Sequence, residues 1–137
     1  MLQIREFRLA DYDAVIRLWR AAGIQLSCSD DQAEIIHKLE RDADLFLVAV
    51  EADALVGAVM GAYDGRRGWV YHLAIHPSYQ GRGFGAAMIA ELEERLRHKG
   101  CQKVNLLIEP DNAHVQHFYE RLHYQRDDLI FMEKWLT

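Results

Sequence analysis

Three glycines alternate with larger side chains in one short segment, at Gly81, Gly83 and Gly85. The segment follows a strand-like run that Pro77 ends, and it precedes a long amphipathic stretch typical of a helix. A helix N-terminus presents unpaired N–H groups with a partial positive charge, and glycines let the backbone approach a ligand closely. The pattern therefore predicts a turn that binds a phosphate or another anion.

The spacing of these glycines differs from the common nucleotide motifs. A P-loop needs a Lys followed by Ser or Thr, and no such pair follows Gly85. A dinucleotide fingerprint places GxGxxG after the first strand of a βαβ unit, whereas GxGxG here follows three predicted antiparallel strands. Gln80 and Arg82 can add side-chain donors at the rim. A bound anion is favoured over an empty turn because three glycines at a helix start cost conformational entropy.

Periodicity, capping residues and turn residues predict the elements that position this turn. Strands are predicted at residues 4–7, 45–51, 55–63, 69–76, 103–108, 124–126 and 129–136. Helices are predicted at residues 11–23, after residue 31, and at residues 83–100 and 112–122. The three closely spaced strands indicate an antiparallel meander, and the apolar run at 103–108 indicates a buried parallel strand after a right-handed crossover. The order predicts one α/β domain over residues 1–137.

The composition limits the class of protein. No apolar run approaches the roughly 20 residues that span a bilayer, and the N-terminus lacks a signal-peptide pattern, so we expect a cytoplasmic protein without a membrane partner. A net charge of −5 without a basic stripe argues against nucleic acid as a partner. Cys28 and Cys101 form no CxxC motif, and no histidine pair has an evident third ligand, so no metal is expected.

The turn and a second motif resemble a known family. Gln80-x-x-Gly83-x-Gly85 resembles the Q/R-x-x-G-x-G/A signature of the GNAT superfamily of N-acetyltransferases, and Asn112 with Tyr119 resembles the family's second signature. The resemblance covers essentially the whole chain. It implies a GNAT-type α/β fold, with about four helices flanking a mixed, mostly antiparallel sheet that is splayed between strands 4 and 5.

The same resemblance implies that acetyl-CoA is the co-substrate and lies in the split of the sheet. Backbone groups at the end of the fourth strand would pair with the pantetheine arm, and amides of the turn would hold the pyrophosphate. The cofactor-binding residues implied in this way are Leu73, Ala74, Ile75, Gln80, Gly81, Arg82, Gly83, Phe84, Gly85, Ala86 and Asn112.

The resemblance further implies direct acetyl transfer to a primary amine. Tyr119 would be catalytic, as the general acid that protonates the leaving thiolate. The general base stays open between Tyr71, His72, Glu109 and water. Where the family usually has glycine, this chain has His123, which predicts a left-handed residue after the helix.

The acceptor and the oligomeric state stay open at this stage. The loop at residues 23–29 is expected to wall the acceptor site, while packing is the favoured role for Trp19, Tyr63 and Trp69. Small amines, amino acids, antibiotics and protein N-termini all fit as acceptors, and the family resemblance allows a homodimer. Two alternatives remain: a non-catalytic acyl-CoA-binding or regulatory module on the same fold, and a different CoA-using or phosphate-binding protein, such as an acyltransferase with another acceptor.

Overall fold

The chain forms two compact units in a computed structural model that describes residues 1–137, namely Met1–Leu107 and Ile108–Thr137. None of its helices has the length and apolar character needed to cross a membrane. The prediction that residues 1–137 act as one domain stays a prediction.

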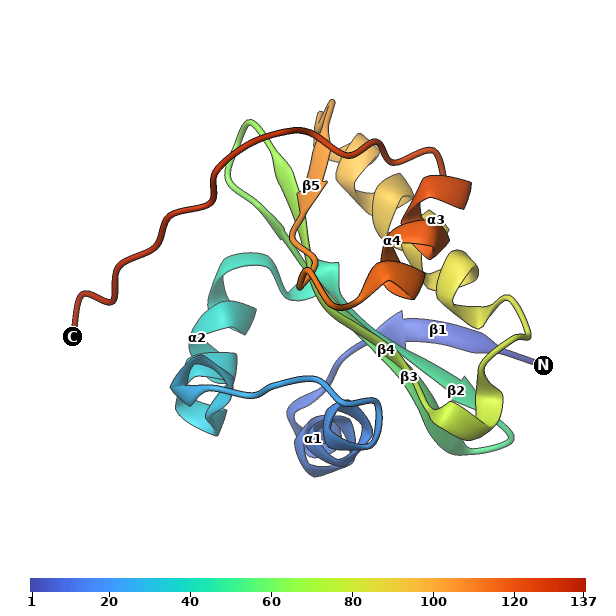
Figure 1. Cartoon of the computed structure of the whole chain (residues 1–137). Helices are drawn as coiled ribbons and strands as arrows, with labels where there is room; N and C mark the ends of the chain where they lie inside the picture. Colours follow the sequence, from blue (N-terminus) through green and yellow to red (C-terminus); the bar gives the residue numbers. More distant parts are fainter. The chain divides into compact units, whose positions relative to one another are not determined.

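The first unit is built on a sheet of five strands, β1(Gln3–Glu6), β2(Phe46–Glu51), β3(Ala54–Tyr63), β4(Gly68–Ile75) and β5(Val104–Leu106) (Figure 1). Their order in the sheet is the order in the sequence. The first four strands are antiparallel neighbours, and β5 runs parallel to β4. The mixed, mostly antiparallel sheet predicted from the sequence is therefore confirmed, as is the parallel direction of the fifth strand.

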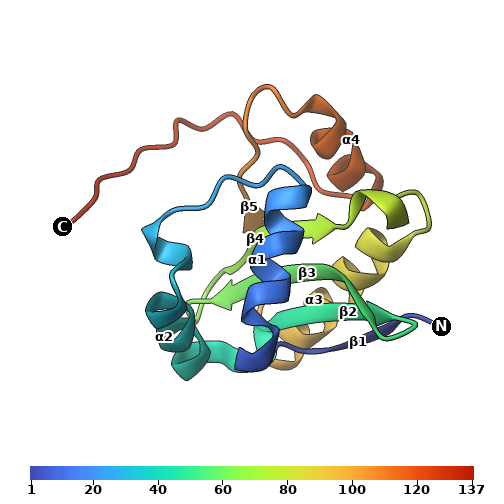
Figure 2. The same cartoon turned by 90° about the horizontal axis from the view of Figure 1, so that it is seen from below.

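Helices of the first unit cover both faces of this sheet: α1(Tyr12–Ala21), α2(Gln32–Asp42) and α3(Phe84–His98). Figure 2 shows α1 in front of the strands and α3 behind them. The helix at residues 83–100 was predicted almost to its ends, because Gly83 and Gly100 both adopt a positive φ at its boundaries.

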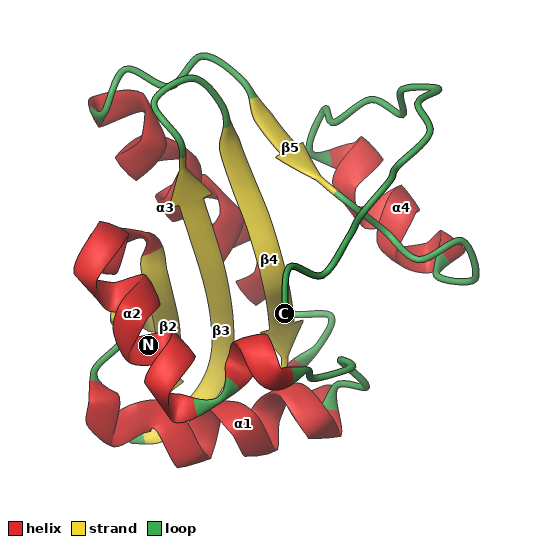
Figure 3. Cartoon of the chain, turned by 90° about the vertical axis from the view of Figure 1, so that its left-hand side faces the viewer, coloured by secondary structure: helices red, strands yellow, loops and turns green.

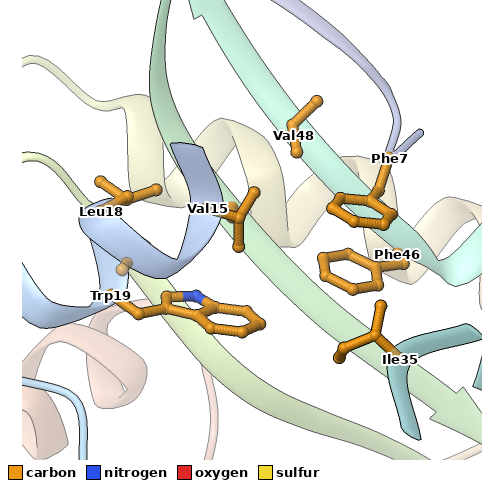
Figure 4. Packing of buried hydrophobic residues seen from close by; sticks show 9 residues of the cluster. Phe7, Val15, Leu18, Trp19, Ile35, Phe46 and Val48 are labelled. Carbon is orange, nitrogen blue, oxygen red and sulfur yellow. The ribbon is translucent and has the colours of Figure 1, made fainter. Parts of the chain in front are cut away.

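The core on the α1 side joins three aromatic rings. The ring centre of Phe46 lies 4.2 Å from that of Phe7 and 6.0 Å from that of Trp19, and both pairs are close to parallel (Figure 4). Val15 and Leu18 of α1 and Ile35 of α2 are buried in the same cluster. Burial of this apolar surface fixes α1 over the middle of the sheet.

The core on the α3 side depends on glycines in β3. A Cβ built on Gly57 would come within 2.9 Å of Met88 Sδ, and one on Gly61 would overlap Leu92. The missing side chains let α3 approach the sheet closely, with Met88 and Leu92 fully buried.

Two irregularities shape β4. Between the pairs Met60–Tyr71 and Ala58–Ala74, β4 contributes one residue more than β3, which makes a β-bulge at His72, whose φ is 52°. The pairing of β4 with β5 ends at Val70, although β4 continues to Ile75. β5 itself ends at Leu106, the partner of Val70, and Figure 3 shows it pointing away from β4, so the predicted splay between strands 4 and 5 is present.

The strand predicted at residues 103–108 is shorter and less buried than expected. It covers Val104–Leu106, its residues are half-buried, and Leu107 is exposed. The prediction of a buried strand was wrong because β5 is the last strand of the sheet and has a neighbour on one side only.

The second unit contains α4(Ala113–Arg121). The helix ends as a Schellman motif, in which His123 N–H donates to Glu120 O and Tyr124 N–H donates to Tyr119 O, both at 3.0 Å. His123 has a φ of 73°, which confirms the predicted left-handed residue.

The strands predicted at residues 124–126 and 129–136 do not form. The chain after α4 has no regular secondary structure, and Leu129, Ile130 and Met132 are exposed. The alternating pattern supplies strand propensity, but a strand also needs a hydrogen-bonded neighbour, and the second unit contains no other strand.

Candidate active site

The start of α3 is an open set of backbone donors. Gly83 precedes Phe84 as the N-cap residue, and its φ of 80° is left-handed. Its carbonyl accepts from Ala87 N–H at 3.1 Å, and no side chain caps this end of the helix. The amides before Ala87 therefore have no acceptor within the helix and lie at the positive end of its dipole, which suits an anion.

The glycines of this turn are required by their left-handed backbone conformation and not by a lack of space for a side chain. Gly81 also has a φ of 80°. A Cβ built on Gly81 or Gly83 would meet no heavy atom within 4 Å. The space beside the turn is thus open, and the left-handed backbone is what excludes other residues.

The polar side chains of the turn have different partners. Gln80 Nε2 donates to Ile75 O at 3.0 Å, which ties the turn to the end of β4. The Arg82 guanidinium lies 5.0 Å from the centre of the Tyr79 ring, in the 3-10 helix η4(Pro77–Tyr79). Gln80 therefore braces the turn through the carbonyl at the strand end, whereas Arg82 keeps its donors beside the turn.

The end of β4 has one edge without a strand beside it. His76 N–H donates to Val56 O at 2.8 Å, and Ala74 pairs with Ala58. Because hydrogen-bonding direction alternates along an antiparallel strand, the amides of Leu73 and Ile75 point away from β3. That is the side on which β5 no longer pairs with β4.

The three predicted cofactor-binding residues at the end of β4 do not all face the open edge. They are Leu73, Ala74 and Ile75. The Ala74 side chain belongs to the buried cluster under α1, and its backbone pairs with β3. Leu73 and Ile75 present their amides to the open edge. An extended ligand with amide groups could pair with this edge as an added strand does.

The bulge residue His72 is held from three directions. Its Nε2 lies 3.0 Å from Asp30 Oδ1, in the 3-10 helix η2(Cys28–Asp30). Its carbonyl accepts from Trp19 Nε1 at 2.9 Å, and the Trp19 ring packs edge-on at 4.8 Å. These contacts hold a non-glycine residue in a left-handed conformation that costs roughly 1–2 kcal/mol.

No pattern in the sequence identifies Asp30 as a candidate site residue. It is 6% exposed, and its second oxygen accepts from Ser27 N–H at 3.0 Å. The segment around it reads as a helix cap, and no motif links it to His72, 42 residues away. Trp19 is fully buried, which confirms the packing role predicted for it.

The other candidates for the general base have different surroundings. Tyr71 stacks near Trp69 at 6.4 Å, and partial burial raises the pKa of its hydroxyl. Glu109 belongs to the second unit and has an exposed side chain. A raised pKa makes Tyr71 a poorer proton acceptor at neutral pH.

Asn112 and Tyr119 both lie on α4 in the second unit. Asn112 holds the N-cap position, but its side chain makes no cap hydrogen bond. Tyr119 is 6% exposed, and its ring packs against Phe118 at 5.0 Å and Tyr124 at 5.4 Å. Burial raises the pKa of the Tyr119 hydroxyl far above its ordinary value, so it stays protonated at neutral pH.

Solved structures with the same fold include acetyltransferases. The PaiA N-acetyltransferase of Thermoplasma acidophilum in complex with coenzyme A superposes with a TM-score of 0.84 at 18% identity, covering 95% of this chain and 93% of that one. Ard1 of Thermoplasma volcanium gives a TM-score of 0.80 at 23% identity, covering 88% and 80%. At these identities the likeness establishes the fold.

Sequence relatives extend the match beyond the fold. Acetyltransferase YE1169 of Yersinia enterocolitica is 42% identical over 135 residues, which is 98% of this chain and 96% of that protein. Acetyltransferase ECA0875 of Pectobacterium atrosepticum is 43% identical over 135 residues, with the same coverage. A model described as the acetyltransferase (GNAT) family matches residues 12–124. The chain therefore belongs to the GNAT family and is an N-acetyltransferase.

Proposed function

We propose that this protein transfers the acetyl group of acetyl-CoA directly to a primary amine. One observation carries the proposal. The edge of β4 that loses its neighbour after Val70 leads through η4 into the uncapped N-terminus of α3. An elongated ligand with amides at one end and phosphates at the other matches this sequence of donors.

The residues of the first unit fit coenzyme A in a definite order. The amides of Phe84, Gly85 and Ala86 would bind the pyrophosphate, with Gly81 and Gly83 shaping the turn and Arg82 adding a cation. Leu73 and Ile75 would pair with the pantetheine arm. The coenzyme A complex of PaiA, a protein of the same fold, supports this choice of ligand.

The protein's part in the chemistry is to polarise the thioester and manage protons. Acetyl-CoA supplies an activated acyl group. A backbone N–H at Leu73 or Ile75 would stabilise the negative charge that develops on the acyl oxygen. Tyr119, assigned from the family resemblance, would protonate the departing sulfur, and Asn112 would contact the arm.

The main alternative is a non-catalytic acyl-CoA-binding module, and two measurements separate it from an enzyme. Calorimetric titration with acetyl-CoA, with NAD and ATP as controls, measures binding. Thiol release from acetyl-CoA measures turnover, with L-lysine, spermidine, glucosamine and a short peptide with a free N-terminus as acceptors. Titration with propionyl-CoA tests acyl preference.

We expect acetyl-CoA to bind with micromolar affinity and the controls NAD and ATP not to bind. We also expect thiol release that depends on the amine. Binding without release for any acceptor would favour the non-catalytic module. Folded protein that fails to bind acetyl-CoA would contradict the proposal.

A further inference from the structure

The pair formed by His72 and Asp30 has the chemistry of an oriented base. Asp30 Oδ1 lies 3.0 Å from His72 Nε2, and the carboxyl side chain is 7% exposed. An ionised carboxylate only accepts hydrogen bonds, so Nε2 must carry the hydrogen between them. The neutral imidazole is thereby held in one tautomer, with the lone pair on Nδ1.

The Nδ1 atom of His72 is not fully buried. No hydrogen bond joins it to the protein, yet no buried side-chain nitrogen or oxygen lacks a partner. The His72 side chain is 27% exposed, which is consistent with an accessible Nδ1. The basic nitrogen of this ring is therefore available to a small molecule.

The position of the pair within the first unit matches the open edge of β4. His72 directly precedes Leu73, whose amide points to that edge, and the bulge turns the imidazole toward α1 and η2. Figure 2 shows α1 and α3 on opposite faces of the sheet, so the imidazole, which packs against Trp19 of α1, lies on the face away from α3.

We propose that His72 is the catalytic base of the acetyl transfer and that Asp30 is its positioning residue. This inference rests on the proposed function. The attacking amine gives a proton to Nδ1 as its nitrogen bonds to the acyl carbon and the carbon–sulfur bond breaks. Asp30 stabilises the imidazolium, which afterwards returns its proton to solvent, while the thiolate takes up one proton, so the reaction balances without another reactant.

The strain at His72 supports a functional role. Glycine would adopt a φ of 52° without cost, and the chain has histidine there instead. The hydrogen bond from Trp19 holds the His72 carbonyl, and the contact with Asp30 holds its ring. Strained residues that are held by several contacts cluster at active sites.

The substitution Asp30→Asn tests the positioning role through the tautomer. The Ser27 N–H donor still needs an acceptor in this variant. The amide oxygen of asparagine would therefore face Ser27, and its NH₂ group would face His72. Nε2 would then accept, and Nδ1 would carry the hydrogen. Nitrogen-15 NMR of the ring should show the Nε2–H tautomer in the native protein and the Nδ1–H tautomer in the variant. An Nδ1–H tautomer in the native protein would overturn the proposal without reference to activity.

The substitution His72→Gly tests the catalytic role, and the backbone at this position accepts glycine readily. We expect kcat for thiol release, with the fastest amine of the panel above, to fall about 100- to 10,000-fold, with little change in acetyl-CoA affinity. Added imidazole should restore part of the rate by occupying the vacated space. His123→Gly is the matched control, since it makes the same change at a φ of 73° on an exposed residue and should show neither loss nor rescue.

The outcomes separate this inference from the proposed function. Full activity in His72→Gly, or a loss that imidazole fails to restore, would overturn the role of His72 and leave the enzyme assignment intact. Native protein that binds acetyl-CoA and acetylates no amine would refute the proposed function and this inference with it.

Discussion

Replacing Gly83 by alanine tests how the turn before α3 contributes to binding. Gly83 has a φ of 80°, and a Cβ at this position would meet no atom within 4 Å. Alanine therefore introduces backbone strain without a clash. Gly65, in the turn between β3 and β4, provides a matched control, because its φ is 96° and the space around it is equally open.

The expected stability cost is similar at the two positions. A non-glycine residue in the left-handed region costs about 1–2 kcal/mol. For a chain of this size, that corresponds to a fall in Tm of about 3–8 °C. Both variants should therefore remain folded at 25 °C.

The expected effect on binding differs between them. If Gly83→Ala relaxes its strain by rotating the N-terminal amides of α3, one or two hydrogen bonds to a charged phosphate are weakened, each worth about 1.5–3 kcal/mol. The Kd for acetyl-CoA should then rise about 10-fold or more. Gly65→Ala lies at the opposite end of β4 and should leave this Kd unchanged.

Calorimetric titration of acetyl-CoA and thermal unfolding of both variants check these expectations. Equal Kd values for Gly83→Ala, Gly65→Ala and the native protein would refute the assignment of the turn as the phosphate site. Unequal losses of stability would show that contacts beyond backbone strain act at one of the two turns.

Three further predictions concern other parts of the chain. His123→Gly should raise stability by up to about 1 kcal/mol by relieving the left-handed residue, and a lower Tm would reveal a specific contact of the histidine. Tyr119→Phe should lower kcat about 100- to 10,000-fold with little change in acetyl-CoA affinity, and an unchanged kcat would exclude it as the acid. The hydrogen bond from Arg5 lowers the pKa of Asp11, so this pair contributes stability above pH 3.8 that is lost as the pH falls through the folded-state pKa. Asp11→Asn should therefore lower the urea midpoint at pH 7, and the loss should shrink as the pH falls below 3.8. A loss that stays the same at every pH would contradict the reasoning.

Local patterns were the most reliable guide to the fold. The α3 helix and its turn were predicted because glycine, the helical period and the C-terminal glycine all act within a few residues. The strands of the meander were predicted within two residues for a similar reason, since short connections force neighbouring strands to pair. The strands predicted after residue 123 failed because their pairing depends on a partner outside the segment.

The candidate site divides along the same line. Gly81 and Gly83 could be identified from the sequence, because a left-handed backbone is a local property and glycine is its usual residue. The hydrogen bond from Gln80 to the Ile75 carbonyl could not be identified from the sequence. Which carbonyl needs a partner is known only once the end of β4 is known.

The sequence by itself determined the family, the order of the helices and strands as far as α4, and the turn that we propose for the phosphate. Each depends on residue types that lie close together along the chain, so each can be recognised from the sequence. Only the tertiary structure decided that β4 bulges at His72, that its pairing with β5 stops at Val70 and that Asp30 approaches the imidazole. The packing of α1 and η2 on the sheet accounts for the contacts of His72, because it brings Trp19 and Asp30 within hydrogen-bonding distance and holds His72 in a left-handed conformation.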